Sequence, residues 1–117
     1  MPGMSIHVVD VSRGIVAAGM RVEVYALDGG ERRAVANGVI SANGTLDDPA
    51  LGGMLVAGEY EAVFHVGGYY RDQKVALPAV PFLDVVTYAF GIADPRQHYH
   101  LPFKCTPWGY SCFRGGA

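Results

Sequence analysis

The sequence of 117 residues predicts an all-β domain folded as a two-layered sandwich. Three observations predict this class. Apolar, β-branched and aromatic residues recur at a period of two in segment after segment. Clusters of Gly, Asn, Asp and Pro separate these segments at short and regular intervals. Half of the residues are hydrophobic, which is enough for one core. We therefore expect a single domain over residues 1–117.

The N-terminal part of the chain contains the first three expected strands. These are SIHVVDV (5–11), MRVEVYAL (20–27) and ERRAVANGVIS (31–41). Turn sequences follow each of them: Ser-Arg-Gly at 12–14, Asp-Gly-Gly at 28–30 and Ala-Asn-Gly at 42–44. Asn-Gly suits a tight turn because both residues tolerate a positive φ. We expect Gly38 to mark a β-bulge within the third strand.

The remaining strands are expected after a long irregular segment. They are EYEAVFHV (59–66), FLDVVTYAFGIAD (82–94) and a final hairpin of HYHLPFKC (98–105) and GYSCFR (109–114). The segment 44–58 is rich in Gly and Asp and predicts a loop with at most a short edge strand. The segment 67–77 opens with two glycines and stops before Pro78, so it is the one place where we expect a helix.

Charge and cysteine usage narrow the class of protein. The formal net charge is −2 and the Lys and Arg residues are scattered, which disfavours a nucleic-acid partner. No charged and apolar leader precedes the first strand and no apolar run is long enough to span a bilayer, so we expect a cytoplasmic protein without a membrane partner. Cys105 and Cys112 are expected as reduced thiols rather than as a disulfide.

The four histidines do not predict a metal centre. His7, His65, His98 and His100 are few and dispersed, and the chain lacks CxxC and HExxH spacing. We expect no metal and no cofactor.

Two separated stretches resemble one known family. IHVVDVSRGIVAAGMRVEVY (6–25) is similar to the opening HVLDxxxGxPAxxxxVxLY, and IADPRQHYHLPFKCTPWGYSCFRGG (92–116) to the ending HYHxPLLxSPxGYxxYRGS, of the transthyretin-related family. Its enzymatic branch is the 5-hydroxyisourate hydrolases. The resemblance implies an eight-stranded transthyretin-like sandwich with one short helix. It also implies a homotetramer, assembled as a dimer of dimers, in which the C-terminal tetrapeptide lines the active site.

The resemblance also implies roles for individual residues. His7 and His100 match the two catalytic histidines, and Arg114 lies in the matching tail. Imidazole has an unperturbed pKa of ~6.5 and suits a general base that activates water, although the sequence leaves open which of the two histidines is the base. Arg114 would bind carbonyl or enolate oxygens. His98 and Pro102 share the strand face of His100 and are expected beside the substrate.

This chain departs from the family pattern at three polar positions. Thr45 stands where the family's TNxDGR has its arginine, and the tail reads Phe113-Arg114-Gly115-Gly116 where the family has YRGS. A guanidinium, a phenol hydroxyl and a serine hydroxyl are therefore absent from one expected pocket. We expect Thr45, Phe113, Gly115 and Gly116 to contact the substrate.

Three functions fit this pattern. The first is a hydrolase of an N-methylated, for example trimethylated, 5-hydroxyisourate, which methylxanthine or caffeine breakdown would supply. Methyl groups remove ring N–H donors, and polar groups left unpaired in a buried site cost ~1–3 kcal/mol each. The second is the ordinary 5-hydroxyisourate hydrolase of urate degradation. The third is a non-catalytic transthyretin-like protein that binds a small molecule. Both histidines are retained, which favours an enzyme.

Overall fold

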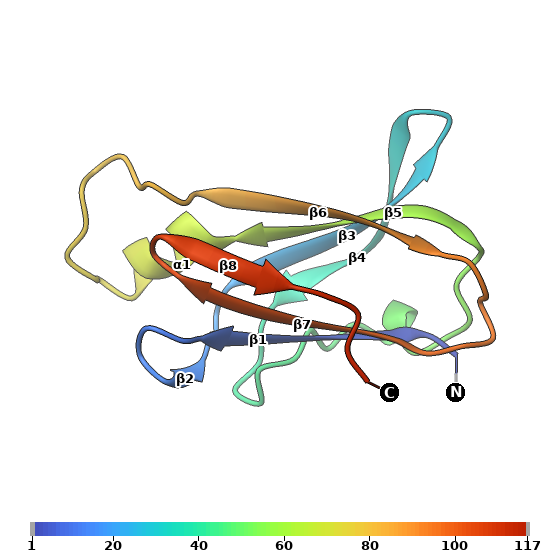
Figure 1. Ribbon diagram of the computed structural model, residues 1–117, viewed down its shortest axis with the longest axis horizontal. Helices are drawn as coiled ribbons and strands as arrows, with labels where there is room; N and C mark the ends of the chain where they lie inside the picture. The colour runs from blue at the N-terminus through green and yellow to red at the C-terminus, as the bar shows by residue number, and fades with distance from the viewer. Residues whose placement is uncertain (1, 117) are drawn as a thin grey trace.

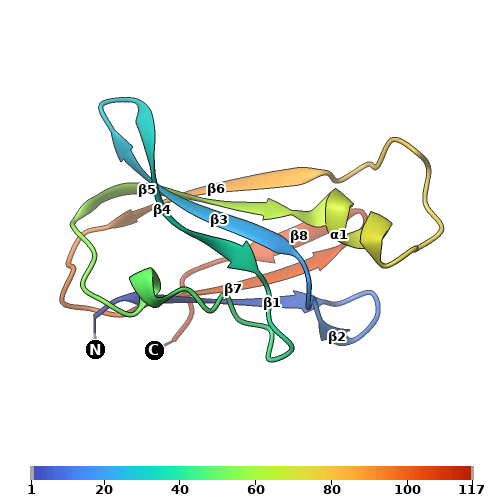
Figure 2. The same ribbon diagram turned by 180° about the vertical axis from the view of Figure 1, so that it is seen from behind.

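The computed structural model describes residues 2–116, which form eight strands, one α-helix and one 3-10 turn. Figures 1 and 2 show two layers of strands with the helix at one end. The elements are β1 (Met4–Asp10), β2 (Ile15–Val16), β3 (Arg21–Asp28), β4 (Glu31–Val39), η1 (Pro49–Leu51), β5 (Gly58–His65), α1 (Val66–Asp72), β6 (Val85–Ile92), β7 (Tyr99–Thr106) and β8 (Gly109–Cys112). The expected eight-stranded all-β sandwich with one short helix is confirmed.

Each layer is a four-stranded sheet. The first has the order β2-β1-β7-β8 and the second β4-β3-β5-β6. All pairs are antiparallel except β1 and β7, which run parallel and join the two ends of the described chain. Both figures accordingly place the two termini near each other, at the end of the sandwich opposite α1.

The core lies between the two sheets and follows from the period-two pattern. Along β1 the side chains are alternately buried and half-buried, so Ile6 and Val8 face the core while His7 faces away from it. Phe64 of β5 and Phe103 of β7 stack across the interior with ring centroids 3.9 Å apart. This contact fixes the second sheet against the strand that carries His100.

The strands differ from the sequence-based predictions in three respects. The bulge in β4 is at Val35, because Val24 pairs with Ala36 and Tyr25 with Ala34, whereas Gly38 pairs regularly with Val22. The eighth strand is Ile15–Val16, paired with the end of β1, and is too short to show a period of two. Strand β6 begins at Val85 rather than at residue 82, after the segment that contains Pro78 and Pro81.

The helix ends at Asp72, well before the predicted end at residue 77. Lys74 adopts a positive φ of 57°, and two backbone bonds close the end: Lys74 N–H to the Arg71 carbonyl and Val75 N–H to the Tyr70 carbonyl. This is a Schellman motif, which terminates a helix without proline. The Schellman motif usually has glycine at the left-handed position. Because this chain has Lys74 there, the sequence did not indicate where the helix ends.

A buried carboxylate ties the helix to the strand of His7. Asp10, at the end of β1, is completely buried and accepts hydrogen bonds from the hydroxyls of Tyr69 (3.0 Å), Tyr70 (2.6 Å) and Ser12 (2.6 Å). Three donors on one carboxylate offset its loss of hydration.

Among the described residues no helix has the length and apolar character that a membrane span requires.

Candidate active site

The parallel pairing of β1 with β7 assembles the candidate site. Ser5 pairs with His100, and His7 pairs with Pro102, all four half-buried on the face that points away from the core. With strand spacing near 4.8 Å and a rise near 3.3 Å per residue, His7 and His100 are diagonal neighbours with Cα atoms roughly 8 Å apart. The fold therefore brings together the two histidines that the sequence separates by most of its length.

His7 is held against the segment that follows the Ser41–Gly44 turn. His7 and Thr45 form an isolated antiparallel bridge, and Val8 N–H donates to the Gly44 carbonyl at 2.8 Å. Gly44 has a φ of 85°, and a Cβ there would lie only 2.7 Å from the His7 Nε2 atom. Gly44 is thus required for two reasons: the turn needs its positive φ, and the His7 imidazole leaves no room for a side chain.

The C-terminal tail covers the second histidine. Gly115 N–H donates to the His100 carbonyl at 2.7 Å, and a Cβ at Gly115 would lie 2.9 Å from His100 Cδ2 and 3.1 Å from Pro102 Cδ. The tail therefore rests directly on the His100 and Pro102 rings. Gly116 differs, because nothing lies within 4 Å of the position of its Cβ.

Burial lowers the pKa of His100 below its usual value of 6.5. Repulsion from His7 and then from His98 acts in the same direction, since a second positive charge beside either ring is unfavourable. The imidazole of His100 is accordingly neutral at neutral pH, which is the state that a general base requires.

Ser5 belongs to the same cluster, although we did not predict it from the sequence. Its hydroxyl lies 2.6 Å from His100 Nδ1 and 2.9 Å from His98 Nε2. The sequence does indicate that Ser5 lies on the same outer face of β1 as His7, because the two residues are two positions apart on one strand. Its contact with His100 depends on the β1–β7 register, which local pattern does not reveal.

The guanidinium of Arg114 lies at the start of β7. It donates to the Gln97 side-chain oxygen at 3.0 Å and to the His98 carbonyl at 3.3 Å, and its carbon lies 4.0 Å from the centroid of the Tyr99 ring. In the single chain it therefore contacts the three residues that precede His100, Gln97, His98 and Tyr99, rather than the His100 imidazole itself.

Of the three positions that depart from the family pattern, Thr45 pairs directly with His7. Thr45 donates its hydroxyl to Asp47 at 2.6 Å and lies 3.1 Å from the Ser41 hydroxyl, so its polar atom is engaged within its own loop. Phe113 is 47% exposed, and the ammonium of Lys104 lies 5.9 Å from its ring centroid. The face thus presents apolar surface where the family pattern has a phenol.

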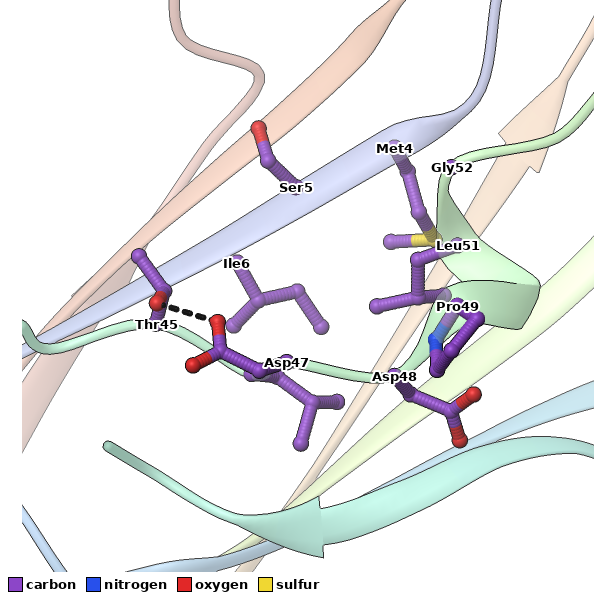
Figure 3. A pocket seen from close by; sticks show the side chains of 10 residues that line it. Met4, Ser5, Ile6, Thr45, Asp47, Asp48, Pro49, Leu51 and Gly52 are labelled. Carbon is purple, nitrogen blue, oxygen red and sulfur yellow. Dashed lines mark hydrogen bonds between the residues drawn. The ribbon is translucent and has the colours of Figure 1, made fainter.

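A cavity of about 480 Å³ lies beside this face, between β1 and the loop that leads to η1 (Figure 3). Its lining consists of Met4, Ser5, Ile6, Thr45, Leu46, Asp47, Asp48, Pro49, Leu51 and Gly52. Ser5 and Thr45 connect it to the histidine cluster, whereas His7 and His100 do not line it. In the part of the chain that the structure describes, no group of three or more His, Cys, Asp or Glu side chains is arranged to hold a metal ion.

Fold and site together define a β-sandwich protein with a paired-histidine site on the outer face of one sheet. The family model described as HIUase/Transthyretin matches residues 4–115, and the chain belongs to this family.

Two known proteins are similar to this chain over nearly its whole length. A 5-hydroxyisourate hydrolase from Deinococcus radiodurans is 44% identical over 97% of this chain and 96% of its own length. One from Mesorhizobium japonicum is 42% identical over 96% of this chain and 90% of its own length.

Solved structures agree with the fold. A chain of (S)-allantoin synthase superposes with a TM-score of 0.87 at 33% identity over 97% of this chain, which spans only 43% of that longer chain. Klebsiella pneumoniae 5-hydroxyisourate hydrolase superposes with a TM-score of 0.78 at 28% identity over 99% of this chain and 100% of its own.

Proposed function

We propose that this single-domain chain is a cofactor-free hydrolase that opens the cyclic amide ring of a 5-hydroxyisourate-type purine oxidation product. The product would be 2-oxo-4-hydroxy-4-carboxy-5-ureidoimidazoline or its methylated counterpart. The observation that carries the proposal is a neutral His100 beside His7, under a tail that rests on both His100 and Pro102. Relatives that are 37–44% identical over nearly the whole chain and bear the name 5-hydroxyisourate hydrolase support the same reaction.

The chemistry needs one base and one proton return. His100 Nε2 takes a proton from water, and the resulting hydroxide oxygen bonds to the ring carbonyl carbon. The carbon–nitrogen bond of the ring then breaks, and the leaving nitrogen receives the proton from the His100 imidazolium. His7 lies on the same face and orients the water or the carbonyl. No electrons are transferred, so the step needs no redox partner.

Arg114 is the positive charge assigned to the oxygen that becomes anionic. Its guanidinium contacts Gln97, which is exposed, so exchanging this amide for a substrate oxygen costs little. A planar fork of donors suits the oxygens of a carbonyl-rich ring. Pro102, Phe113, Gly115, Gly116 and Thr45 form the surroundings of the ring in this proposal.

An N-methylated 5-hydroxyisourate is the substrate that the three departures favour. Thr45 directs its hydroxyl to Asp47, Phe113 has no hydroxyl, and Gly116 has open space at its Cβ position. The site therefore offers few hydrogen-bond acceptors to ring N–H groups and leaves room for methyl groups. Methylxanthine degradation, including that of caffeine, would generate such a compound.

The unmethylated compound is the competing substrate, because the similar hydrolases are named for it. A non-catalytic binding protein is the third candidate. The retained histidine pair disfavours it, because an imidazole kept neutral beside a second one suits acid–base chemistry.

The proposal includes a homotetramer in the cytoplasm. The outer strands β6 and β8 leave unpaired backbone groups, and Trp108 (64% exposed) and Tyr110 (49% exposed) sit on the β7–β8 hairpin. Exposed edges with aromatic side chains favour association between copies. Cys105 and Cys112 are free thiols, which suits a reducing compartment.

Both ring compounds, generated freshly and followed by the loss of their ultraviolet absorbance, test the proposal. We expect the chain to accelerate both decays over the uncatalysed rate, with the higher kcat/KM for the methylated compound. A higher value for the parent compound would contradict the methylated preference and leave the hydrolase intact. If the chain accelerates the decay of neither compound, the proposed hydrolase activity is wrong.

A further inference from the structure

A continuous row of hydrogen-bonding groups leads from the chain's N-terminal segment to His100. The Pro2 carbonyl lies 3.2 Å from His98 Nδ1, the other nitrogen of that ring lies 2.9 Å from the Ser5 hydroxyl, and the same hydroxyl lies 2.6 Å from His100 Nδ1. Each side chain is half-buried, and the row ends at the ring that the mechanism uses as its base.

The chemistry of the first member sets the direction of every bond. A carbonyl oxygen only accepts, so His98 Nδ1 must carry the proton. In a neutral imidazole the other nitrogen, Nε2, is then an acceptor, and the Ser5 hydroxyl donates to it. A serine hydroxyl has a single proton. Ser5 Oγ therefore faces His100 Nδ1 with a lone pair, and that nitrogen carries the proton.

The reverse arrangement is disfavoured electrostatically. For Ser5 to donate to His100 Nδ1, His98 would have to donate from both of its nitrogens and be a cation. A charged His98 would lie half-buried beside another imidazole, where loss of hydration disfavours the cation. The neutral row, with all protons pointing from His100 towards Pro2, is the arrangement that avoids this cost.

We propose that Ser5 and His98 are positioning residues that hold His100 in the Nδ1–H tautomer, which leaves His100 Nε2 as the free base. This differs from the substrate contact expected for His98. The catalytic consequence rests on the proposed function, but the tautomer does not. When Nε2 takes the proton from water, the Nδ1–H bond to Ser5 becomes charge-assisted and stronger. No proton moves along the row.

Nitrogen-15 NMR of histidine-labelled protein measures the tautomer without any substrate. Protonated and unprotonated ring nitrogens resonate in separate regions, so each ring reports its own state. At neutral pH we expect Nδ1 protonated and Nε2 unprotonated in both His100 and His98. The opposite tautomer at His100 in the wild-type protein would overturn the proposal, whether or not any variant folds.

Variants of Ser5 separate positioning from general stability. We expect Ser5→Ala to mix the tautomers of His100 and to lower kcat about 10- to 100-fold with little change in KM. Ser5→Thr keeps the hydroxyl and should restore both readouts, whereas Ser111→Ala, an exposed serine on β8, should change neither. A folded Ser5→Ala protein with the wild-type tautomer and kcat would overturn the role of Ser5.

His98 has its own test. We expect His98→Ala to lower kcat rather than to raise KM, because Ser5 loses its acceptor while the substrate loses no contact. A raised KM with unchanged kcat would show a substrate contact and overturn the positioning role. If wild-type protein hydrolyses neither ring compound, the proposed function fails, yet the NMR result still decides the tautomer.

Discussion

Three features of its surroundings lower the pKa of His100. Burial, His7 and His98 all disfavour the imidazolium, so its pKa lies below 6.5. The unfolded chain lacks these influences and binds a proton more readily. The free energy of folding that comes from the neutral ring is therefore fully present above pH ~6.5, the pKa of an unperturbed histidine. It is lost as the pH falls towards the lowered pKa of His100 in the folded protein.

The same shift predicts the acid side of the pH–rate profile. Since the base acts in its neutral form, kcat/KM should hold below pH 6.5 and fall only near the lowered pKa of His100. Initial rates over a pH series, corrected for the uncatalysed decay, give the midpoint. A midpoint at or above 6.5 would contradict the assignment of His100 as the base.

The departures around the site predict a change of specificity. We expect the combined variant Thr45→Arg, Phe113→Tyr and Gly116→Ser to shift the ratio of kcat/KM values towards the unmethylated ring, because it restores three polar groups. Gly116→Ser fits sterically, since its Cβ would meet open space. The ratio is measured with both compounds in parallel. An unchanged ratio would argue that these positions do not select the substrate.

Pairing between elements decides what the sequence reveals. Period-two patterns identified the longer strands because each buries one face. They missed Ile15–Val16, which has too few residues for a period, and placed the bulge at Gly38 when the extra residue is Val35. The helix was predicted too long because Lys74, not glycine, takes the left-handed position. Tertiary contacts and the local backbone conformation determine the short strand, the bulge and the end of the helix, and sequence composition does not reveal them.

The same limit applies to the site. The family resemblance supplied His7, His100 and the tail as candidates, and the β1–β7 pairing places them together. Ser5 was missed because its partners are distant in sequence, and the contacts of Arg114 with Gln97 and Tyr99 follow from the path of the tail. Side-chain partners across sheets require the register, which only the folded chain provides.

The junction between α1 and β1 predicts a stability effect away from the site. Tyr70→Phe removes the 2.6 Å hydrogen bond to the buried Asp10 carboxylate and should lower the free energy of unfolding by ~1–3 kcal/mol. Chemical denaturation measures the loss. Tyr25→Phe is a matched control, because that hydroxyl bonds to the half-buried Glu23 and should cost less. Equal losses would contradict the special weight of Asp10.

At the scale of the whole molecule, the histidine face of the single chain is open. His7, His100 and Gly115 are half-buried, and the nearby cavity is bounded by β1 and one loop. A site that excludes water needs a further wall, which a second copy of the chain would provide.

We therefore expect a tetramer by analytical ultracentrifugation, with specific activity that falls when dilution dissociates it. The concentration series should show the same midpoint for mass and for activity. Full activity in a monomeric fraction would contradict the proposal that assembly completes the site.

The rate of ring opening by wild-type protein and by His100→Ala, measured side by side on freshly generated substrate, tests the central claim most directly. We expect the wild type to accelerate the loss of ultraviolet absorbance and the variant to lose roughly 10²- to 10⁴-fold of that turnover while keeping its thermal unfolding transition. A folded His100→Ala protein that retains wild-type turnover would contradict the account.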